Sequence, residues 1–173
     1  MPLETLVRRT GRAAGWLNLV LIALIVIDVS LRKAFDLTAN WVIELEWHLF
    51  ALIFMLGIPY ALQRDRHVRV DLFYDRFPVR DRALVNFIGG LLFLLPWAAV
   101  LLWFSGAYWW ESWQSAEGSP NPNGIPLYWP IKMVIPLTAL LLLVQGAVLV
   151  IRDWRQWAET GSLAGEEGEN GEP

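Results

Sequence analysis

Long apolar runs alternate with short charged strips along the whole chain. The four apolar runs are roughly residues 15–31, 41–62, 83–105 and 131–151. Each supplies about 20 mainly apolar residues, the length that an α-helix needs to cross a hydrocarbon core of about 30 Å. A helix on the surface of a soluble protein carries a polar stripe, whereas the stretch GGLLFLLPWAAVLLWF at 89–104 has none. The pattern therefore predicts an all-α integral membrane protein with four transmembrane helices.

The first run has a second interpretation, because Arg8, Arg9 and Arg12 precede it as basic residues precede the apolar part of a signal peptide. However, Arg32 and Lys33 follow the run, and no obvious small-x-small cleavage site is present. We therefore favour a retained transmembrane helix.

Lys and Arg are distributed unevenly between the two ends of these helices. Three Arg lie in the N-terminal segment, six in the loop between the second and third runs, and two after the fourth run. The opposite side carries only Arg32 and Lys33, together with Lys132 where the fourth run begins. Basic loops tend to stay in the cytoplasm, and an even number of spans returns both ends to one side. We expect the N and C termini to be cytoplasmic.

These boundaries divide the chain into three parts. We expect a cytoplasmic N-terminal segment at 1–14, a four-helix membrane domain at 15–152 with a cytoplasmic loop at 63–82 and a periplasmic loop at 106–130, and a cytoplasmic tail at 153–173. The end of the tail, TGSLAGEEGENGEP, is acidic, rich in Gly and almost free of large apolar residues. Such a composition buries too little apolar surface to fold alone, so the tail is expected to be mostly disordered.

The cytoplasmic loop contains the densest group of charges, RDRHVRVDLFYDRF at 64–77. Apolar residues are interleaved with Arg and Asp, so the apolar side chains can enter the membrane interface while the charged ones stay in water. A basic residue near anionic lipid gains about 1 kcal/mol. Arg64, Arg66 and Arg69 are therefore predicted to anchor the loop to membrane lipids.

The loop after the third run is rich in Trp and in turn-forming residues. The chain has 11 Trp, and four of them, at 109, 110, 113 and 129, flank this loop. Trp is enriched where helices meet the headgroup layer. The stretch SPNPNGIP at 119–126 predicts an ordered, non-helical hairpin. Pro96 and Pro136 lie inside apolar runs and are expected to kink their helices.

Ionisable residues close to the membrane are the first candidates for function, because burying them in lipid is costly. Asp28 and Arg32 are four residues apart and are expected to form an ion pair at one helix end. Glu44 and His48 also share a helix face. They could relay protons or form a fixed hydrogen-bonded link to a neighbouring helix. We favour the structural link, because no deeper ionisable group continues a relay.

Few other kinds of chemistry fit this composition. The chain has no Cys and two His, so a Cys-based metal site or a bis-His haem within the membrane is not expected. His67 and Asp71, four residues apart, are interpreted as a pair that orients the cytoplasmic loop. We expect no catalytic residues, no metal and no cofactor. Nucleic-acid binding is not expected either, because the Arg residues lie at helix junctions and not along one face.

Two segments resemble one family of membrane proteins. WHLFALIFMLGIPYALQRDRHVRVDLFYDRFPVRDRALVNFIGG, with HVRVD after the second run, and EGSPNPNGIPLYWPIKMVIPLTALLLLVQG are similar to the small membrane subunit of TRAP (tripartite ATP-independent periplasmic) transporters, the DctQ-like family. The resemblance covers about residues 15–152.

The resemblance implies a non-enzymatic role in the bacterial inner membrane. The small subunit would be a scaffold for a large elevator-type subunit in sodium-coupled uptake of an organic acid or similar solute, which a periplasmic solute-binding protein delivers. The motif positions, which are candidates for partner contact or structure, are Glu44, His67, Asp71, Gly124, Pro126, Lys132 and Pro136, with His48 as a departure from the pattern. Alternatives are a membrane anchor of a redox enzyme and a self-contained four-helix channel.

Overall fold

The computed structural model describes residues 2–64 and 77–169. Within these ranges the chain is helical, with loops and without strands. The elements are α1 (Pro2–Phe35), α2 (Asn40–Gln63), α4 (Val79–Gly89), the π-helix η1 (Gly90–Leu94), α5 (Leu95–Gln114), α6 (Trp129–Lys132) and α7 (Val134–Glu169).

Within the described residues, four stretches of helix are long and apolar enough to cross a membrane. They are Val7–Phe35, Asn40–Gln63, Val79–Gln114 and Trp129–Thr160. The predicted all-α fold with four membrane-crossing helices is therefore confirmed. At about 1.5 Å per residue, a stretch of 29 residues exceeds a hydrocarbon core of about 30 Å, so its ends reach the headgroup layers or the helix tilts.

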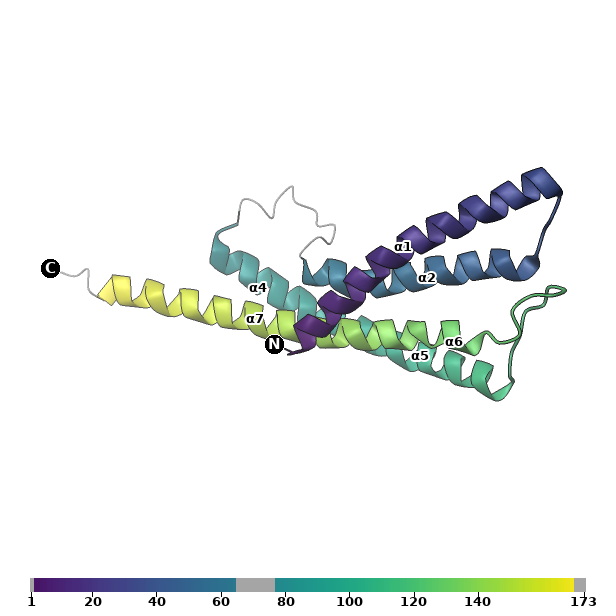
Figure 1. Cartoon of the computed structure of the whole chain (residues 1–173). Helices are drawn as coiled ribbons and strands as arrows, with labels where there is room; N and C mark the ends of the chain where they lie inside the picture. Colours follow the sequence, from purple (N-terminus) through teal and green to yellow (C-terminus); the bar gives the residue numbers. More distant parts are fainter. Residues whose placement is uncertain (1, 65–76, 170–173) are drawn as a thin grey trace.

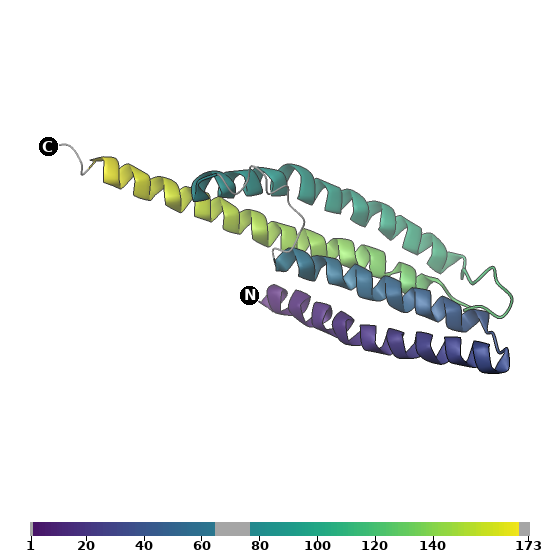
Figure 2. The same ribbon diagram turned by 90° about the horizontal axis from the view of Figure 1, so that it is seen from above.

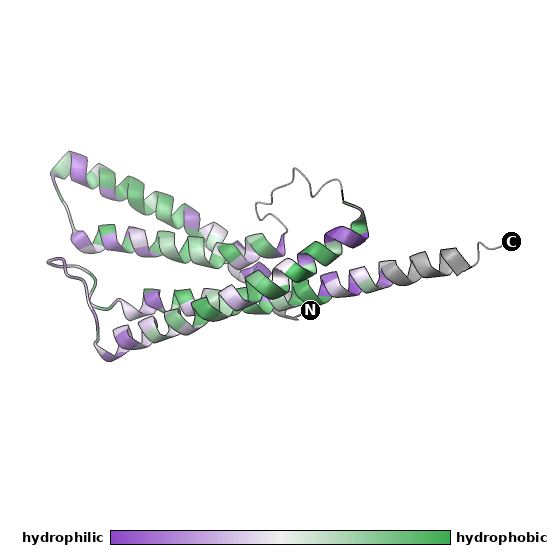
Figure 3. Cartoon of the chain, turned by 180° about the vertical axis from the view of Figure 1, so that it is seen from behind, coloured by the Kyte–Doolittle hydropathy of each residue, from purple (hydrophilic) through white to green (hydrophobic). Residues whose placement is uncertain are grey.

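The helices form an open layer in which α7 is central. α1 packs mainly on α2, whereas α7 contacts α2, α4 and α5. Figure 2 shows the resulting order across the layer, with α1 at one edge and α4 and α5 at the other. Apolar residues cover the middle of the helices and hydrophilic residues gather at their ends (Figure 3).

Residues 36–39 and 115–128 lie at the same end of the molecule, which we call the hairpin end (Figure 1). The second of these segments is shorter than the predicted periplasmic loop at 106–130. α5 continues through the Trp-rich stretch to Gln114, and the rings of Trp109 and Trp113, one helical turn apart, lie 6.3 Å from each other between centroids.

Small residues allow α5 and α7 to pack closely. On α5 the buried residues are Ala98, Ser105 and Ser112, which are seven residues apart and share one face. Gly146 of α7 lies opposite the start of this face, where an added Cβ would lie 3.1 Å from side-chain atoms of Leu94 and Leu95. Close approach over small side chains is the usual way in which helices associate in lipid. We call this contact the α5–α7 seam.

The two prolines predicted to kink helices have different local effects. Pro96 follows the π-helix Gly90–Leu94. It has no N–H to give to the carbonyl four residues earlier, and the wider π turn accommodates this loss. Pro136 lies in the first turn of α7, just after the break at Met133 that separates α6 from α7. The missing N–H of Pro136 deprives the Lys132 carbonyl of its α-helical donor, which accounts for the break.

Helix α7 continues to Glu169, into the segment that the sequence predicted to be mostly disordered from residue 153. Tertiary packing explains the extension for its first two turns. The Trp154 ring lies 4.9 Å from Phe87 of α4 and 5.1 Å from Trp157, between ring centroids. The Arg80 guanidinium lies 5.7 Å from the Trp157 ring centroid. These contacts pack residues 154–157 of α7 against α4.

Candidate functional site

Polar contacts at the hairpin end connect three parts of the chain that are far apart in sequence. The hairpin, residues 115–128, closes through its own backbone. The Ser119 N–H donates to the Ile125 carbonyl at 2.9 Å, and the Tyr128 N–H donates to the Glu117 carbonyl at 2.8 Å. Between them, the Gly124 N–H donates to the Asn121 carbonyl at 3.1 Å. The ordered hairpin expected from SPNPNGIP is present.

The Glu44 carboxylate, in the first two turns of α2, holds this hairpin. Glu44 is buried, and its Oε1 accepts hydrogen bonds from the Ser119 hydroxyl and, at 2.9 Å, from the Asn121 side-chain amide. Its Oε2 accepts the backbone N–H of Ile125 at 2.7 Å. Three donors of one loop therefore satisfy one carboxylate on a different helix.

Gly124 and Pro126 belong to the same arrangement. A Cβ on Gly124 would collide with the Ser119 hydroxyl and lie 2.7 Å from Glu44 Oε1. Only glycine leaves room for the carboxylate to reach its donors. A Cβ on Gly118 would lie 2.7 Å from the Pro126 carbonyl oxygen, so the two arms of the hairpin also meet there.

His48 contacts the backbone of Glu44 and not its carboxylate. The ring Nδ1 lies 2.5 Å from the Glu44 carbonyl oxygen, which makes Nδ1 the donor. The ring also lies 5.2 Å from that of Tyr128, between centroids. His48 therefore fixes the start of α2 against the end of the hairpin. This hydrogen bond lies within α2, and no imidazole nitrogen lies on the Glu44 carboxylate.

Lys132 forms a second attachment. Its side chain is almost fully buried, and its ammonium group pairs with Glu117 of the hairpin and lies 4.0 Å from the centroid of the Tyr108 ring of α5. The hydrogen bond from Lys132, with a smaller contribution from Ser112, lowers the pKa of the Glu117 carboxyl below its usual 4.5. The hairpin is thus tied to α2 through Glu44 and to α5 and α6 through Lys132.

Aromatic rings surround this polar cluster. Trp113 and Trp129 are in edge contact, with centroids 4.4 Å apart, and Trp109 lies 6.3 Å from Trp113. Trp110 is half exposed. The four tryptophans therefore form a band at the hairpin end, the position expected for a membrane interface.

The remaining predicted residues lie elsewhere. The expected ion pair of Asp28 and Arg32 is present. Arg64 lies at the opposite end of α2, with its guanidinium 5.3 Å from the Tyr60 ring centroid. His67, Asp71, Arg66 and Arg69 lie outside the described residues. Pro136 lies outside the polar cluster, about one turn after Lys132. Its effect is on the backbone, at the break between α6 and α7.

The sequence pattern does not indicate that Ser119, Asn121, Glu117 and Tyr108 are partners in this cluster. Ser and Asn in a turn-forming stretch predict only the turn. Their pairing with Glu44 joins residues 75 and 77 positions apart, which no local pattern reports. Among the described residues no group of three or more His, Asp or Glu side chains could hold a metal ion. The cluster positions a loop, and hydrogen-bond donors face the carboxylates of both Glu44 and Glu117.

Comparison with known proteins supports the resemblance seen in the sequence. The profile of the family described as Tripartite ATP-independent periplasmic transporters, DctQ component, matches residues 21–156. A comparison with curated proteins gave no match. Because the matched region includes most of all four membrane-crossing stretches and most of the chain, the protein belongs to the DctQ component family of tripartite ATP-independent periplasmic transporters.

Proposed function

We propose that this chain is the small permease subunit of a sodium-coupled TRAP secondary transporter. It serves as a scaffold for a large elevator subunit that takes up an organic acid or a similar solute. A periplasmic solute-binding protein delivers that solute. Family membership supports the role as a transporter component, and the distribution of charge along the four spans supports the division of labour.

The observation that carries this proposal is a charge-free middle in every span. No Asp, Glu, Lys, Arg or His occurs in residues 13–27, 49–63, 83–110 or 133–151. At the hairpin end, Glu44 and the Lys132–Glu117 pair hold a loop. Transporters place charged or discontinuous polar sites near the middle of the membrane. A chain without such charges is better suited to support a carrier than to be one.

The exposed faces of the layer are suited to contact with lipid and with another membrane protein. On α5, Trp97, Trp103 and Phe104 are 71%, 78% and 68% exposed. On α2, Trp47 and Phe50 are 73% and 62% exposed. Only a few residues of these two helices, such as Glu44 and Pro59 of α2 and Ala98 of α5, are fully buried within the chain itself. An open layer of this kind offers a broad apolar flank to a larger subunit.

Co-purification is the direct test. An affinity-tagged copy of this chain, co-expressed with the large TRAP subunit, is expected to retain that subunit through detergent extraction and size-exclusion chromatography. A tagged, unrelated four-helix membrane protein is the control for non-specific association. Failure to retain the large subunit in mild detergent would contradict the scaffold role.

Uptake into liposomes separates the scaffold from a self-contained channel. Liposomes with this chain alone are expected to take up none of a panel of radiolabelled organic acids. Liposomes with both membrane subunits and the binding protein are expected to take up one of them when a sodium gradient is present. Uptake by the chain alone would favour the channel.

A further inference from the structure

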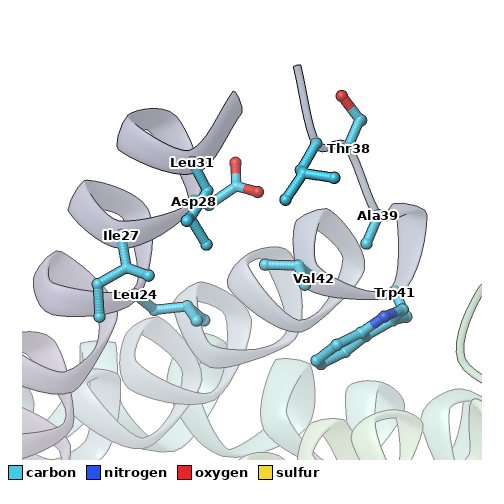
Figure 4. A pocket seen from close by; sticks show the side chains of 9 residues that line it. Leu24, Ile27, Asp28, Leu31, Thr38, Ala39, Trp41 and Val42 are labelled. Atoms are coloured by element: carbon cyan, nitrogen blue, oxygen red, sulfur yellow. The ribbon is translucent and has the colours of Figure 1, made fainter. Parts of the chain in front are cut away.

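One side of α1 packs on the rest of the chain. Figure 4 shows Leu24 and Asp28 on the side of α1 that faces Val42 of α2, where the two helices diverge and a pocket lies between them. The buried residues of α1 recur at seven-residue intervals and include Val7, Ala14, Leu21 and Asp28. This side of the helix is therefore already occupied by contacts within the chain.

Another side of α1 is exposed over four helical turns. It carries residues spaced three or four positions apart, which therefore share one helix face. These residues, which we call the Asn18 face, are Gly15, Asn18, Ile22, Ile25 and Val29, and all of them are exposed. A Cβ added to Gly15 would have no neighbour within 4 Å, so another helix can approach closely at this glycine.

Asn18 distinguishes this face from the other exposed surfaces of the four spans. In their charge-free segments, Asn18 is the one exposed residue among the Asn, Gln, Ser and Thr residues. The others are buried or half-buried, and they are Gln63, Asn86, Ser105, Thr138 and Gln145. No hydrogen bond within the described part of the chain involves the Asn18 side chain. Its amide therefore needs a partner from outside the chain.

Asn18 lies too deep for water or lipid headgroups to supply that partner. It follows Arg12 by six residues and precedes Asp28 by ten, which is about 9 Å and about 15 Å along the helix. Its side chain is too short to reach a headgroup layer from there, unlike that of Lys or Arg. Acyl chains offer neither donor nor acceptor, and an amide left without hydrogen bonds in hydrocarbon is strongly unfavourable. The partner must be a polar group on another membrane helix.

We propose that the Asn18 face binds the same face of a second copy of this chain, in a parallel pair of α1 helices with two-fold symmetry. A two-fold contact brings the same residue of both copies together. Each Asn18 amide is both donor and acceptor, so the two amides satisfy each other. Hydrogen bonds between helices and close approach over small residues are the interactions that associate helices in lipid.

Depth and position both select a second copy as the occupant. The positive-inside rule gives every copy the same orientation, so a second copy presents its own amide at the depth of Asn18. In addition, α1 forms one edge of the layer (Figure 2), so the second copy displaces no other helix. The exposed aromatic residues of α2 and α5 stay available for contact with a large subunit.

Disulfide crosslinking in membranes tests this pair, because the chain has no Cys of its own. Ile22→Cys places a thiol one turn from Asn18 on the same face. Val20→Cys is the matched control, a similarly exposed position at nearly the same depth on a different side of α1. Membranes that contain the full-length chain and a Cys-free large subunit are oxidised with copper phenanthroline, and the products are separated without reductant.

Ile22→Cys is expected to give a disulfide-linked dimer, and Val20→Cys much less of it. Adding Asn18→Leu to Ile22→Cys is expected to lower the yield of dimer about five-fold, the effect of losing a hydrogen bond between membrane helices. Adding Asn18→Gln, which keeps an amide, is expected to retain most of it. Thermal unfolding in detergent is expected to be the same for Asn18→Leu and wild type, which separates loss of pairing from loss of folding.

Equal yields from Ile22→Cys and Val20→Cys would indicate random collisions and would overturn the proposal. An unchanged yield with Asn18→Leu would also overturn it, because the amide would then not hold the pair. A dimer that forms only when the large subunit is absent would assign the Asn18 face to that subunit and contradict the proposal. Co-purification of the large subunit with the wild type depends on none of these results, so the scaffold role is tested separately.

Discussion

Glu44 shows how a single residue near the membrane surface can organise a loop. Its two carboxylate oxygens accept hydrogen bonds from Ser119, Asn121 and Ile125. Hydrogen bonds to a charged acceptor are stronger than those between neutral groups. The absence of a side chain at Gly124 leaves space for this contact. The carboxylate and the glycine therefore form one structural unit, although they lie on different elements.

Replacing Glu44 with Gln is expected to loosen the hairpin. The glutamine side chain is neutral, and its NH2 group replaces one of the two carboxylate oxygens. This donor then faces the N–H or O–H groups of the hairpin, with which it cannot form the same hydrogen bonds. The backbone amide of Ile125 is then expected to exchange its hydrogen faster, as measured by hydrogen–deuterium exchange with mass spectrometry. The control is Glu111→Gln, because Glu111 is an exposed glutamate in the last turn of α5, just before the hairpin. Equal exchange in Glu44→Gln and wild type would show that the backbone alone holds the hairpin.

The Glu117–Lys132 pair predicts a dependence on pH. Because the bond to Lys132 lowers the pKa of Glu117, the pair stabilises the hairpin fully above the ordinary pKa of 4.5. That contribution is lost as the pH falls through the lowered value. Glu117→Gln is therefore expected to unfold at a lower temperature than wild type at pH 7. The difference should disappear in strong acid.

Thermal scans of both proteins between pH 7 and pH 3 would check this. A difference in unfolding temperature that stays constant over the whole range would mean that the charge of Glu117 has no role. Since Glu117 is about 40% exposed, we expect the effect to shrink with added salt as well.

At the scale of elements, the α5–α7 seam determines how closely two spans approach. From α5, small side chains face the seam at Ala98, Ser105 and Ser112. From α7, Gly146 faces Leu94 and Leu95, and a Cβ added to it would lie only 3.1 Å from their side chains. Lipid tails are as apolar as the helices, so close packing, not burial from water, holds such a contact together.

Gly146→Leu is expected to lower stability by about 1–3 kcal/mol, the usual effect of overpacking a close contact. Thermal unfolding in detergent would measure the change. Gly106→Leu is the matched control, since Gly106 also lies within a membrane-crossing helix but a Cβ there would have no neighbour within 4 Å. Similar losses in the two variants would indicate a backbone effect of glycine and would argue against the seam.

At the scale of the whole molecule, the chain is a component of the bacterial inner membrane, as its family and its four membrane-crossing stretches show. Its hairpin and its α1–α2 loop lie at one end. By sequence, the excess of Arg falls in the N-terminal segment, the loop at 63–82 and the tail, which adjoin the opposite ends of the four spans. From the positive-inside rule we therefore expect the hairpin end to lie in the periplasm.

Cysteine labelling tests this orientation cleanly, because the chain has no Cys of its own. Single variants Pro120→Cys in the hairpin and Gln156→Cys toward the opposite end of α7 are both at exposed positions. A membrane-impermeant maleimide is expected to label Pro120→Cys in intact spheroplasts and Gln156→Cys only after lysis. The reverse pattern would show that both termini are periplasmic.

The Arg-rich loop leads to a related prediction. Replacing Arg64, Arg66 and Arg69 together with Glu is expected to weaken assembly or to invert the local topology, because the loop then repels anionic lipid. The same labelling assay on Pro120→Cys, combined with co-purification of the large subunit, would measure both effects. Unchanged labelling and unchanged assembly would show that these three Arg do not anchor the loop.

The sequence by itself determined that the chain has four spans. In lipid each backbone N–H and C=O must be satisfied within its own helix, so about 20 apolar residues are a sufficient local signal. The turn formers at 119–126 and the ion pair four residues apart at Asp28 and Arg32 are local in the same sense.

Only the tertiary structure decided which helix is central and what holds the hairpin. An apolar helix surface can pack against any other apolar helix, so hydropathy does not predict that α7 lies between α2 and α5. Glu44 meets its three donors across 75 to 81 residues, and α7 extends past residue 153 because Trp154 packs on Phe87. The pocket between α1 and α2 exists because the helices diverge. Each of these features depends on contacts between distant segments, which a local pattern of apolar and polar residues does not encode.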